Sequence, residues 1–354
     1  MFWQGRRVFL TGHTGFKGGW LALWLQHHGA EVCGYALPPY TNPSLYEEAS
    51  IASGMESIFG DIRDLETLKR DLHAWKPEVV LHLAAQPLVR ASYDDPIGTY
   101  ATNVMGTAHV LESARTCPSV RSIVVVTTDK CYENKEWCWP YRETDALGGY
   151  DPYSNSKACT ELVASAYRSS FFHPKDYAKH GIAMATGRAG NVIGGGDWSA
   201  DRLIPDMIRG FMAHEPVVIR NPLAIRPWQH VLEPLRGYLM LAEQLYTGTE
   251  MGEAWNFGPE PDNAKSVQWV ADYLVEHWGG DARWKLADEA APHEAQLLKL
   301  DSSKAASRLK WGPALTIEQG VDMTLAWYQE KVKGSDMRAV TLSQIAAYEA
   351  HAMR

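Results

Sequence analysis

The chain has 354 residues, of which 45% are hydrophobic and 21% are charged, a composition typical of one large or two ordinary globular domains. The formal net charge is -8 and no basic run is present to neutralise phosphates, so we do not expect a nucleic-acid-binding protein. No apolar run reaches the roughly 18 residues that a membrane-spanning helix needs. The five cysteines form no C-x-x-C pair, which favours reduced thiols and a cytoplasmic location. The histidines are scattered, and we expect no metal site.

A short apolar run at 8–10 is followed at once by a glycine-rich turn. Gly12, Gly15 and Gly18 are spaced G-x-x-G-x-x-G, and apolar residues then recur with helical spacing over 20–25. A turn without side chains between a strand and a helix lets a pyrophosphate approach the backbone and the helix N-terminus. The pattern predicts a dinucleotide site, although chance glycine triplets are common and the spacing differs from G-x-G-x-x-G.

The segment after the second predicted strand, 31–35, bears on the choice of dinucleotide. It lacks the acidic residue that is expected to bond the ribose 2′-hydroxyl about 20 residues after the glycine turn. The segment 34–45 also lacks an arginine or lysine that could meet a 2′-phosphate. The missing basic residue favours NAD over its 2′-phosphorylated form.

Further strands are predicted at 79–84, 122–128 and 183–188, separated by predicted helices such as 64–75 and 103–115. Strands that alternate with helices indicate a parallel, doubly wound sheet. We therefore predict an α/β protein with a Rossmann sheet.

Glycine and proline become frequent after Asn191, and the predicted elements become shorter. This change predicts a smaller, mixed α/β C-terminal substrate domain. We place the NAD-binding domain at 1–190, with 228–258 returning to it, and the remainder of 191–354 in the substrate domain.

The segment Tyr153-Ser-Asn-Ser-Lys157 places a phenol and an ammonium one helical turn apart, on the same face. A tyrosine with a pKa near 10 is a poor base at neutral pH, but a nearby ammonium favours the phenolate. Tyr153 can then take a proton from a substrate hydroxyl while the carbon loses hydride. The spacing alone is common by chance, so this interpretation depends on the motifs around it.

Three other segments lie where a Rossmann sheet places its ligand. Asp61-Ile-Arg-Asp64 falls near the end of a third strand, within reach of an adenine, although a helix N-cap at either aspartate is also consistent. Ala84-Ala85-Gln86 falls beside the nicotinamide ribose, with core packing as the alternative. Thr127-Thr-Asp-Lys130 follows the fifth strand, where Asp129 is either an acid catalyst or a cap of the loop.

The motifs G-x-x-G-x-x-G, D-I-R-D, H-L-A-A-Q, T-T-D-K, Y-S-N-S-K, R-A-G-N-V and R-P-W-Q-H-V occur here in this order. Over nearly its whole length the chain resembles the extended short-chain dehydrogenase/reductase superfamily that acts on nucleotide sugars. The segments 127–132, 134–137, 194–198 and 219–231 are similar to those of 4,6-dehydratases that use CDP-D-glucose. The resemblance implies an NAD-dependent lyase that forms CDP-4-dehydro-6-deoxy-D-glucose and water.

The resemblance also implies the catalytic roles. Tyr153 is expected to be the base at C4, with Lys157 lowering its pKa, and Thr128 is expected to bond the C4 oxygen. Asp129 is expected to protonate the departing C6 hydroxyl, which requires a raised pKa. Related dTDP-glucose dehydratases carry a glutamate as the C5 base where this chain has Lys130, so Lys130 is either a neutral base or an electrostatic stabiliser.

The binding residues that the resemblance implies form two sets. For the cofactor they are Gly12, Thr14, Gly15, Phe16, Lys17, Gly18, Asp61, Ile62, Leu83, Ala84, Ala85, Gln86, Asn103, Thr127, Tyr153 and Lys157. For the substrate they are Asn191 and Arg226 at the diphosphate, and Arg202, Arg220, Asn221, His293 and Glu294. Surface salt bridging is an equal interpretation for individual members of the second set.

The resemblance further implies a homodimer or tetramer that uses helices near 103–115 and 153–169, and a place in the synthesis of lipopolysaccharide O-antigen sugars. Two alternatives stay open at this point. One is a dehydratase or epimerase for another nucleotide sugar, and an epimerase does not need the Asp129-Lys130 pair. The other is a non-catalytic NAD-sensing protein, which could lose Tyr153 or Lys157 without cost.

Overall fold

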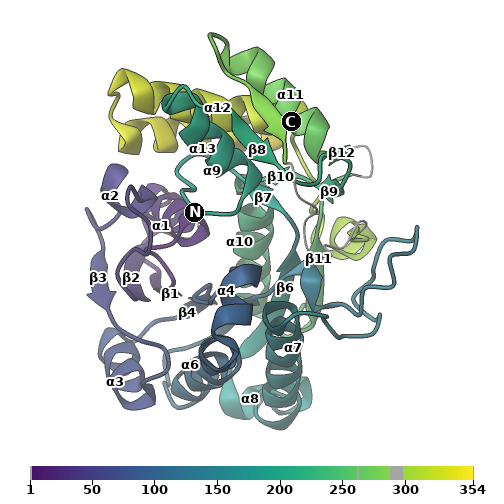
Figure 1. The fold of residues 1–354 in the computed structure, drawn as a ribbon. Coiled ribbons are helices and arrows are strands. Elements are labelled where there is room, and N and C mark those ends of the chain that lie inside the picture. The colour runs from purple at the N-terminus through teal and green to yellow at the C-terminus, as the bar shows by residue number, and fades with distance from the viewer. Residues whose placement is uncertain (1, 261–262, 288–297, 354) are drawn as a thin grey trace.

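The computed structural model describes residues 2–260, 263–287 and 298–353. Its central sheet has seven parallel strands in the order β11-β6-β5-β4-β1-β2-β3 (Figure 1). These strands are β1 (Arg7–Thr11), β2 (Glu31–Ala36), β3 (Glu56–Phe59), β4 (Val79–His82), β5 (Ser122–Val126), β6 (Ala183–Ala189) and β11 (Ala254–Phe257). Because β1 lies between β2 and β4, the chain winds outward in both directions, which confirms the predicted doubly wound sheet.

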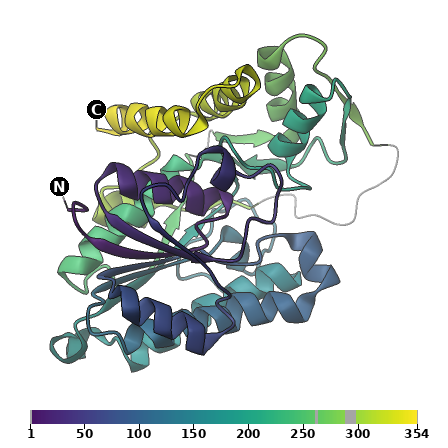
Figure 2. The same ribbon diagram turned by 90° about the vertical axis from the view of Figure 1, so that its left-hand side faces the viewer.

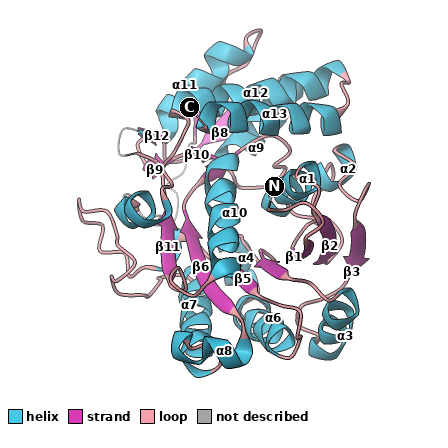
Figure 3. Cartoon of the chain, turned by 180° about the vertical axis from the view of Figure 1, so that it is seen from behind, coloured by secondary structure: helices cyan, strands magenta, loops and turns pink. Residues whose placement is uncertain are grey.

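Helices cover both faces of the sheet. The longer helices in the sheet layers are α1 (Phe16–His27), α3 (Leu65–Trp75), α6 (Gly106–Arg115), α7 (Pro152–Ser170) and α10 (Leu232–Thr247). α3, α6 and α7 pack side by side on one face, and α1 and α10 lie on the other (Figure 2). Seen from behind, α10 lies over β5 and β6 (Figure 3). The shorter helices near the sheet are α2 (Leu45–Glu48), α4 (Val89–Asp94), α5 (Pro96–Tyr100) and α8 (Tyr177–His180).

Side-chain alternation along the strands creates a separate core on each face. Val8 and Leu10 on β1 belong to the large core with Trp20 and Leu21 of α1. Phe9, between them, belongs to the second core, which includes residues of α3, α6 and α7. Apolar residues on both faces explain why the strands read as continuous hydrophobic runs in the sequence.

The C-terminal part is built from helices and two-stranded sheets. The helices are α9 (Leu203–Met212), α11 (Val267–Trp278), α12 (Ile317–Lys333) and α13 (Met337–Ala352). The strand pairs are β7 (Val192–Ile193) with β10 (Gln229–His230), β8 (Val217–Ile219) with β13 (Trp284–Leu286), and β9 (Ile225–Pro227) with β12 (Ala264–Ser266). The exact domain boundaries stay a prediction. Every helix in the described part of the chain is too short or too polar to cross a lipid bilayer.

The predicted helix 103–115 begins differently from the expectation. A π-helical turn covers Ala101–Met105, and α6 starts only at Gly106. The Asn103 carbonyl accepts hydrogen bonds from the Thr107 and Thr160 hydroxyls at 2.7 and 2.8 Å, so two side-chain hydroxyls bond to the backbone within the π-helical turn. Such turns recur at functional sites, and this one positions the Asn103 side chain described below.

Glu233 attaches the C-terminal helices to the sheet layers. Its buried carboxylate accepts hydrogen bonds from the Ala314 and Leu315 amides and from the Tyr348 hydroxyl, at 2.7–2.8 Å. Glu233→Ala is expected to lower the free energy of unfolding by about 3 kcal/mol, because buried donors lose their acceptor. Urea denaturation measures this change. Glu276→Ala, at an exposed position on α11, is the control, and equal effects from the two variants would contradict the prediction.

Candidate active site

The predicted tyrosine and lysine lie at the start of α7. Asp151 caps this helix by accepting a hydrogen bond from the Ser154 amide at 2.9 Å, and Pro152 fixes its first turn. Tyr153 therefore sits at the helix N-terminus and Lys157 one turn further along the same face. Both side chains are buried, with 9% and 6% of their surface exposed.

Burial changes the proton affinities of both groups. It lowers the pKa of Lys157 to about 8, while the Glu161 carboxylate opposes that shift. It raises the pKa of Tyr153 to about 12, against a hydrogen bond with the Thr128 side chain. Tyr153 is thus a phenol at neutral pH, and it can act as a base only when positive charge stabilises its phenolate.

The end of β5 supplies the second half of the site. Thr128 donates to Asp129 Oδ1 at 3.0 Å, and its hydroxyl also accepts from the Lys130 amide as the N-cap of a 3-10 turn over Asp129–Cys131. Asp129 is 2% exposed. Burial raises the pKa of Asp129, although the Lys130 ammonium and the Thr128 hydroxyl oppose this. Asp129 therefore keeps its proton to a higher pH than an exposed aspartate, as a general acid requires.

The glycine turn leaves the N-terminus of α1 open. Gly12 has a φ of +82°, and a Cβ there would lie 2.7 Å from the Ala84 nitrogen. At Gly18 a Cβ would lie 2.0 Å from the Gly12 carbonyl oxygen, so the helix packs directly on the turn. At Gly15 a Cβ would have only that carbonyl within 4 Å, at 3.4 Å. The open space beside Gly15, at the N-terminus of α1, suits a pyrophosphate.

Hydrogen bonds also fix the segment after β4. The Thr11 hydroxyl bonds the His82 ring and accepts from the amides of Leu83 and Ala84. The Asn103 side chain accepts from the Gln86 amide at 2.8 Å and donates to the Gln86 carbonyl. Asn103 also donates to Ser156 Oγ on α7 at 2.8 Å, which joins the loop 83–86 to the helix that carries Tyr153.

The remaining predicted cofactor residues lie around the same edge of the sheet. The Thr14 hydroxyl donates to the Leu37 carbonyl at 2.8 Å, which connects the glycine turn to the end of β2. Asp61 forms an ion pair with Arg63, and Ile62 is buried under Gly106. Three members remain: Phe16 is the first residue of α1, Ala85 lies in the loop after β4, and Thr127 directly follows β5.

Lys17 lies close to the predicted catalytic groups. Burial, together with the positive charges of Arg202 and Lys157, lowers the pKa of Lys17 to about 7, and Asp129 opposes this shift. The site thus gathers several cations around one aspartate, as expected for a site that takes an anionic ligand.

The predicted substrate residues are less closely gathered. Arg202 pairs with buried Asp197 at 2.9 Å, and its charge acts on Tyr153. Arg220 instead pairs with exposed Asp201 at 3.2 Å, the surface salt bridge that the sequence left open. Arg226 donates to the Ile225 carbonyl, whereas Asn191 and Asn221 accept backbone bonds from Gln229 and Ala224. His293 and Glu294 lie outside the described residues.

A buried ion pair that the sequence pattern did not predict lies beside this site. Glu161, one turn beyond Lys157 on α7, pairs with Arg188 of β6 at 2.8 Å, and the two side chains are 3% and 4% exposed. The available signal was the repeat of spacing four from Tyr153 to Lys157 to Glu161.

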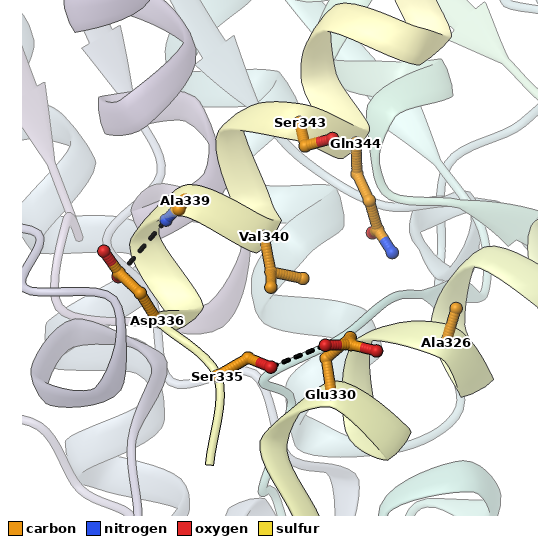
Figure 4. Close-up of a pocket in the computed structure, with 8 residues that line it drawn as sticks. All are labelled: Ala326, Glu330, Ser335, Asp336, Ala339, Val340, Ser343 and Gln344. Carbon is orange, nitrogen blue, oxygen red and sulfur yellow. Dashed lines mark hydrogen bonds between the residues drawn. The ribbon is translucent and has the colours of Figure 1, made fainter. Parts of the chain in front are cut away.

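A hollow between α12 and α13 is a separate feature (Figure 4). Its carboxylates form hydrogen bonds within the protein: Glu330 accepts from Ser335 Oγ at 2.5 Å, and Asp336 caps α13. It lies among the C-terminal helices, away from Tyr153 and Asp129, and we assign no function to it.

Three features meet at the carboxyl edge of this doubly wound sheet: a glycine turn, a Tyr-Lys pair on one helix and a Thr-Asp pair after β5. This arrangement defines a dinucleotide-dependent enzyme. Comparison with known families makes the assignment specific. The family model described as GDP-mannose 4,6 dehydratase matches residues 9–324, and the chain belongs to this family.

Individual relatives are similar over almost the whole chain. The CDP-glucose 4,6-dehydratase of Salmonella typhimurium is 54% identical over 348 residues, covering 98% of this chain and 97% of the relative. A dTDP-glucose 4,6-dehydratase of Xanthomonas campestris pv. campestris is 27% identical, covering 90% and 92%. Among solved structures, the dTDP-glucose 4,6-dehydratase DesIV of Streptomyces venezuelae, with NAD bound, has a TM-score of 0.76 at 22% identity, covering 94% of this chain and 99% of that one. The structural match supports the fold.

Proposed function

We propose that this protein converts CDP-D-glucose to CDP-4-dehydro-6-deoxy-D-glucose and water, with NAD as a cofactor that is regenerated in each cycle. The observation that carries the proposal is the position of the buried acid Asp129 beside the Tyr153-Lys157 pair, since a simple dehydrogenase or epimerase has no use for that acid. The 54% identity to a CDP-glucose 4,6-dehydratase supports the choice of substrate.

The residues of the site fit NAD. The open N-terminus of α1 above Gly15 suits the pyrophosphate, and the loop 83–86 lies beside it. Segment 34–45, which follows β2, carries no lysine or arginine for a 2′-phosphate. When bound, NAD supplies a hydride acceptor at C4, a hydride donor at C6 and a positive charge that favours the Tyr153 phenolate.

The oxidation step needs a proton acceptor at the C4 hydroxyl. Tyr153 takes this proton, while Thr128, already bonded to Asp129, holds the oxygen. Lys157, one turn along α7 from Tyr153, donates to the Val126 carbonyl at 3.3 Å, which holds its ammonium at the end of β5. The ammonium lowers the energy of the phenolate, and the proton is therefore removed as the hydride leaves.

The elimination step needs an acid and a base. A ketone at C4 makes the C5 hydrogen acidic, and the C6 hydroxyl leaves as water when Asp129 protonates it. The raised pKa of Asp129 suits this role. Lys130 is next in the chain and is partly buried, so it can act at C5 either as a neutral base or by stabilising the enolate charge.

Lys130→Gln distinguishes these two roles. If Lys130 is the C5 base, the variant should incorporate no solvent deuterium at C5 while oxidation at C4 continues, because the amide cannot carry the proton. Mass spectrometry of the sugar nucleotides recovered from deuterated water measures this. Normal incorporation at a reduced rate would assign Lys130 to charge stabilisation instead.

Substrate deuterated at C4 tests the proposed reaction. The 6-methyl group of the product should carry the deuterium, because the hydride removed from C4 returns to the carbon that lost the hydroxyl. Deuterium retained at C4, in a sugar that has lost no water, would indicate an epimerase and contradict the proposal.

We also propose a cytoplasmic homodimer that serves the synthesis of O-antigen sugars, as the family resemblance of the sequence implies. The helical layer of α5 to α7 carries the exposed apolar residues Ile97, Met105 and Leu162, which suit a subunit interface. All five cysteines are free thiols, which is consistent with the proposed cytoplasmic location. Light scattering at micromolar concentration should give the mass of two chains, and a single-chain mass would contradict the dimer.

A further inference from the structure

We propose that Glu161 is a positioning residue for the reaction: its carboxylate fixes the segment Thr127–Asp129 against α7 and places a negative charge one helical turn from Lys157. This inference rests on the function proposed above and adds a residue to which the catalytic steps assign no role.

The contacts of Glu161 join the helix that carries the base to the strand end that carries the acid. Its Oε1 accepts from Thr127 Oγ1 at 2.5 Å. Its Oε2 accepts from Thr186 Oγ1 and from Arg188 Nη2, both at 2.8 Å. Thr127 directly precedes Thr128 and Asp129, so the carboxylate of Glu161 sets the direction in which these two side chains leave β5.

The surroundings keep Glu161 ionised. Burial raises the pKa of the carboxyl group, but the Arg188 guanidinium and the hydroxyls of Thr127 and Thr186 bring the pKa below its ordinary value. Arg188 is held in turn by the Tyr132 hydroxyl at 2.7 Å and by the Glu143 carbonyl. A fixed negative charge is thus available within the buried site.

Lys157 is the catalytic group on which this charge acts. The titratable groups around it are Tyr153 and Glu161, each one turn away along α7, Cys131 in the turn after β5, Lys17 at the start of α1 and His82 on β4. His82 is neutral because burial lowers its pKa to about 3. Glu161 opposes the burial that lowers the pKa of Lys157 to about 8, so the ammonium persists at neutral pH.

Glu161→Gln tests this role because it keeps the shape of the side chain and removes the charge. The wild-type kcat should fall above a pH of about 8, as Lys157 loses its proton. In the variant this fall should move to lower pH by about one unit, with kcat near pH 8 reduced by about fivefold. Glu161→Asp, which keeps the charge, should leave the fall near its wild-type position.

Thr186→Val is the matched control, since it removes one hydrogen bond to the same carboxylate without removing its charge. It should lower Tm and leave the pH profile in place. If Glu161→Gln does not fold because Arg188 is left unpaired, the double variant Glu161→Gln/Arg188→Met removes both buried charges and should show the same shifted profile.

This experiment distinguishes a failure of the proposed function from a failure of the role of Glu161. A wild-type protein that releases no water from CDP-D-glucose overturns the proposed function, and the role of Glu161 falls with it. An active wild type whose alkaline fall in kcat is unmoved in the folded Glu161 variants overturns this inference alone.

Discussion

Tyr153→Phe should reduce kcat by about 10³-fold, the loss expected when a positioned proton acceptor is removed. The variant keeps the aromatic ring in its buried place and removes only the oxygen that receives the C4 proton. Both oxidation and water loss should fall together, because no ketone forms at C4 to make the C5 hydrogen acidic. Steady-state rates and calorimetric binding of CDP-D-glucose measure the two consequences, and binding should change little.

Tyr246→Phe is the matched control for this variant. Its hydroxyl bonds Arg6 and Glu78 near the opposite edge of the sheet, so it removes a tyrosine hydroxyl without touching the site. Its kcat should stay within about twofold of the wild type. A Tyr153→Phe variant that keeps more than a tenth of wild-type activity would exclude Tyr153 as the base.

Asp129→Asn should separate the two halves of the reaction. The amide keeps the size of the side chain but donates no acidic proton to the C6 hydroxyl, and water loss should slow by about 10² to 10³-fold. Oxidation at C4 should persist, because Tyr153 and Lys157 are intact. Rapid quench followed by mass spectrometry should therefore find a 4-keto sugar that still carries its C6 hydroxyl.

Asp176→Asn serves as the control for the loss of a carboxylate, since the Asp176 side chain is half exposed and far from the site. In the described part of the chain its ion pair is with surface Lys179. It should dehydrate substrate at the wild-type rate. If Asp129→Asn loses oxidation and elimination equally, Asp129 orients the substrate and another group is the acid.

Much of the fold follows from local sequence pattern. The strand β1, the glycine turn and α1 form a short, uninterrupted unit, and β5 is a continuous apolar run, so the local sequence places them. The short strand β11 carries no such signal. It takes its place because Ala254–Phe257 pairs with β6, a contact between residues far apart in the chain.

The site could be predicted only in part, for the same reason. Tyr153 and Lys157 are visible because one helix holds both, and Asp129 because it follows a strand directly. The bonds from Glu161 to Thr127 and Thr186 depend on how α7 packs between two strand ends, which spacing along the chain does not encode. For Arg220 the residue type suggests a phosphate ligand, but in the structure its guanidinium pairs with Asp201 at the surface.

The most direct test of the account is to incubate the purified protein with NAD and, separately, with the CDP, UDP, GDP and dTDP forms of glucose, and to follow the products by mass spectrometry. The account predicts loss of one water from CDP-D-glucose and little or none from the other three. Water loss from another form but not from CDP-D-glucose, or from none of the four, would contradict it.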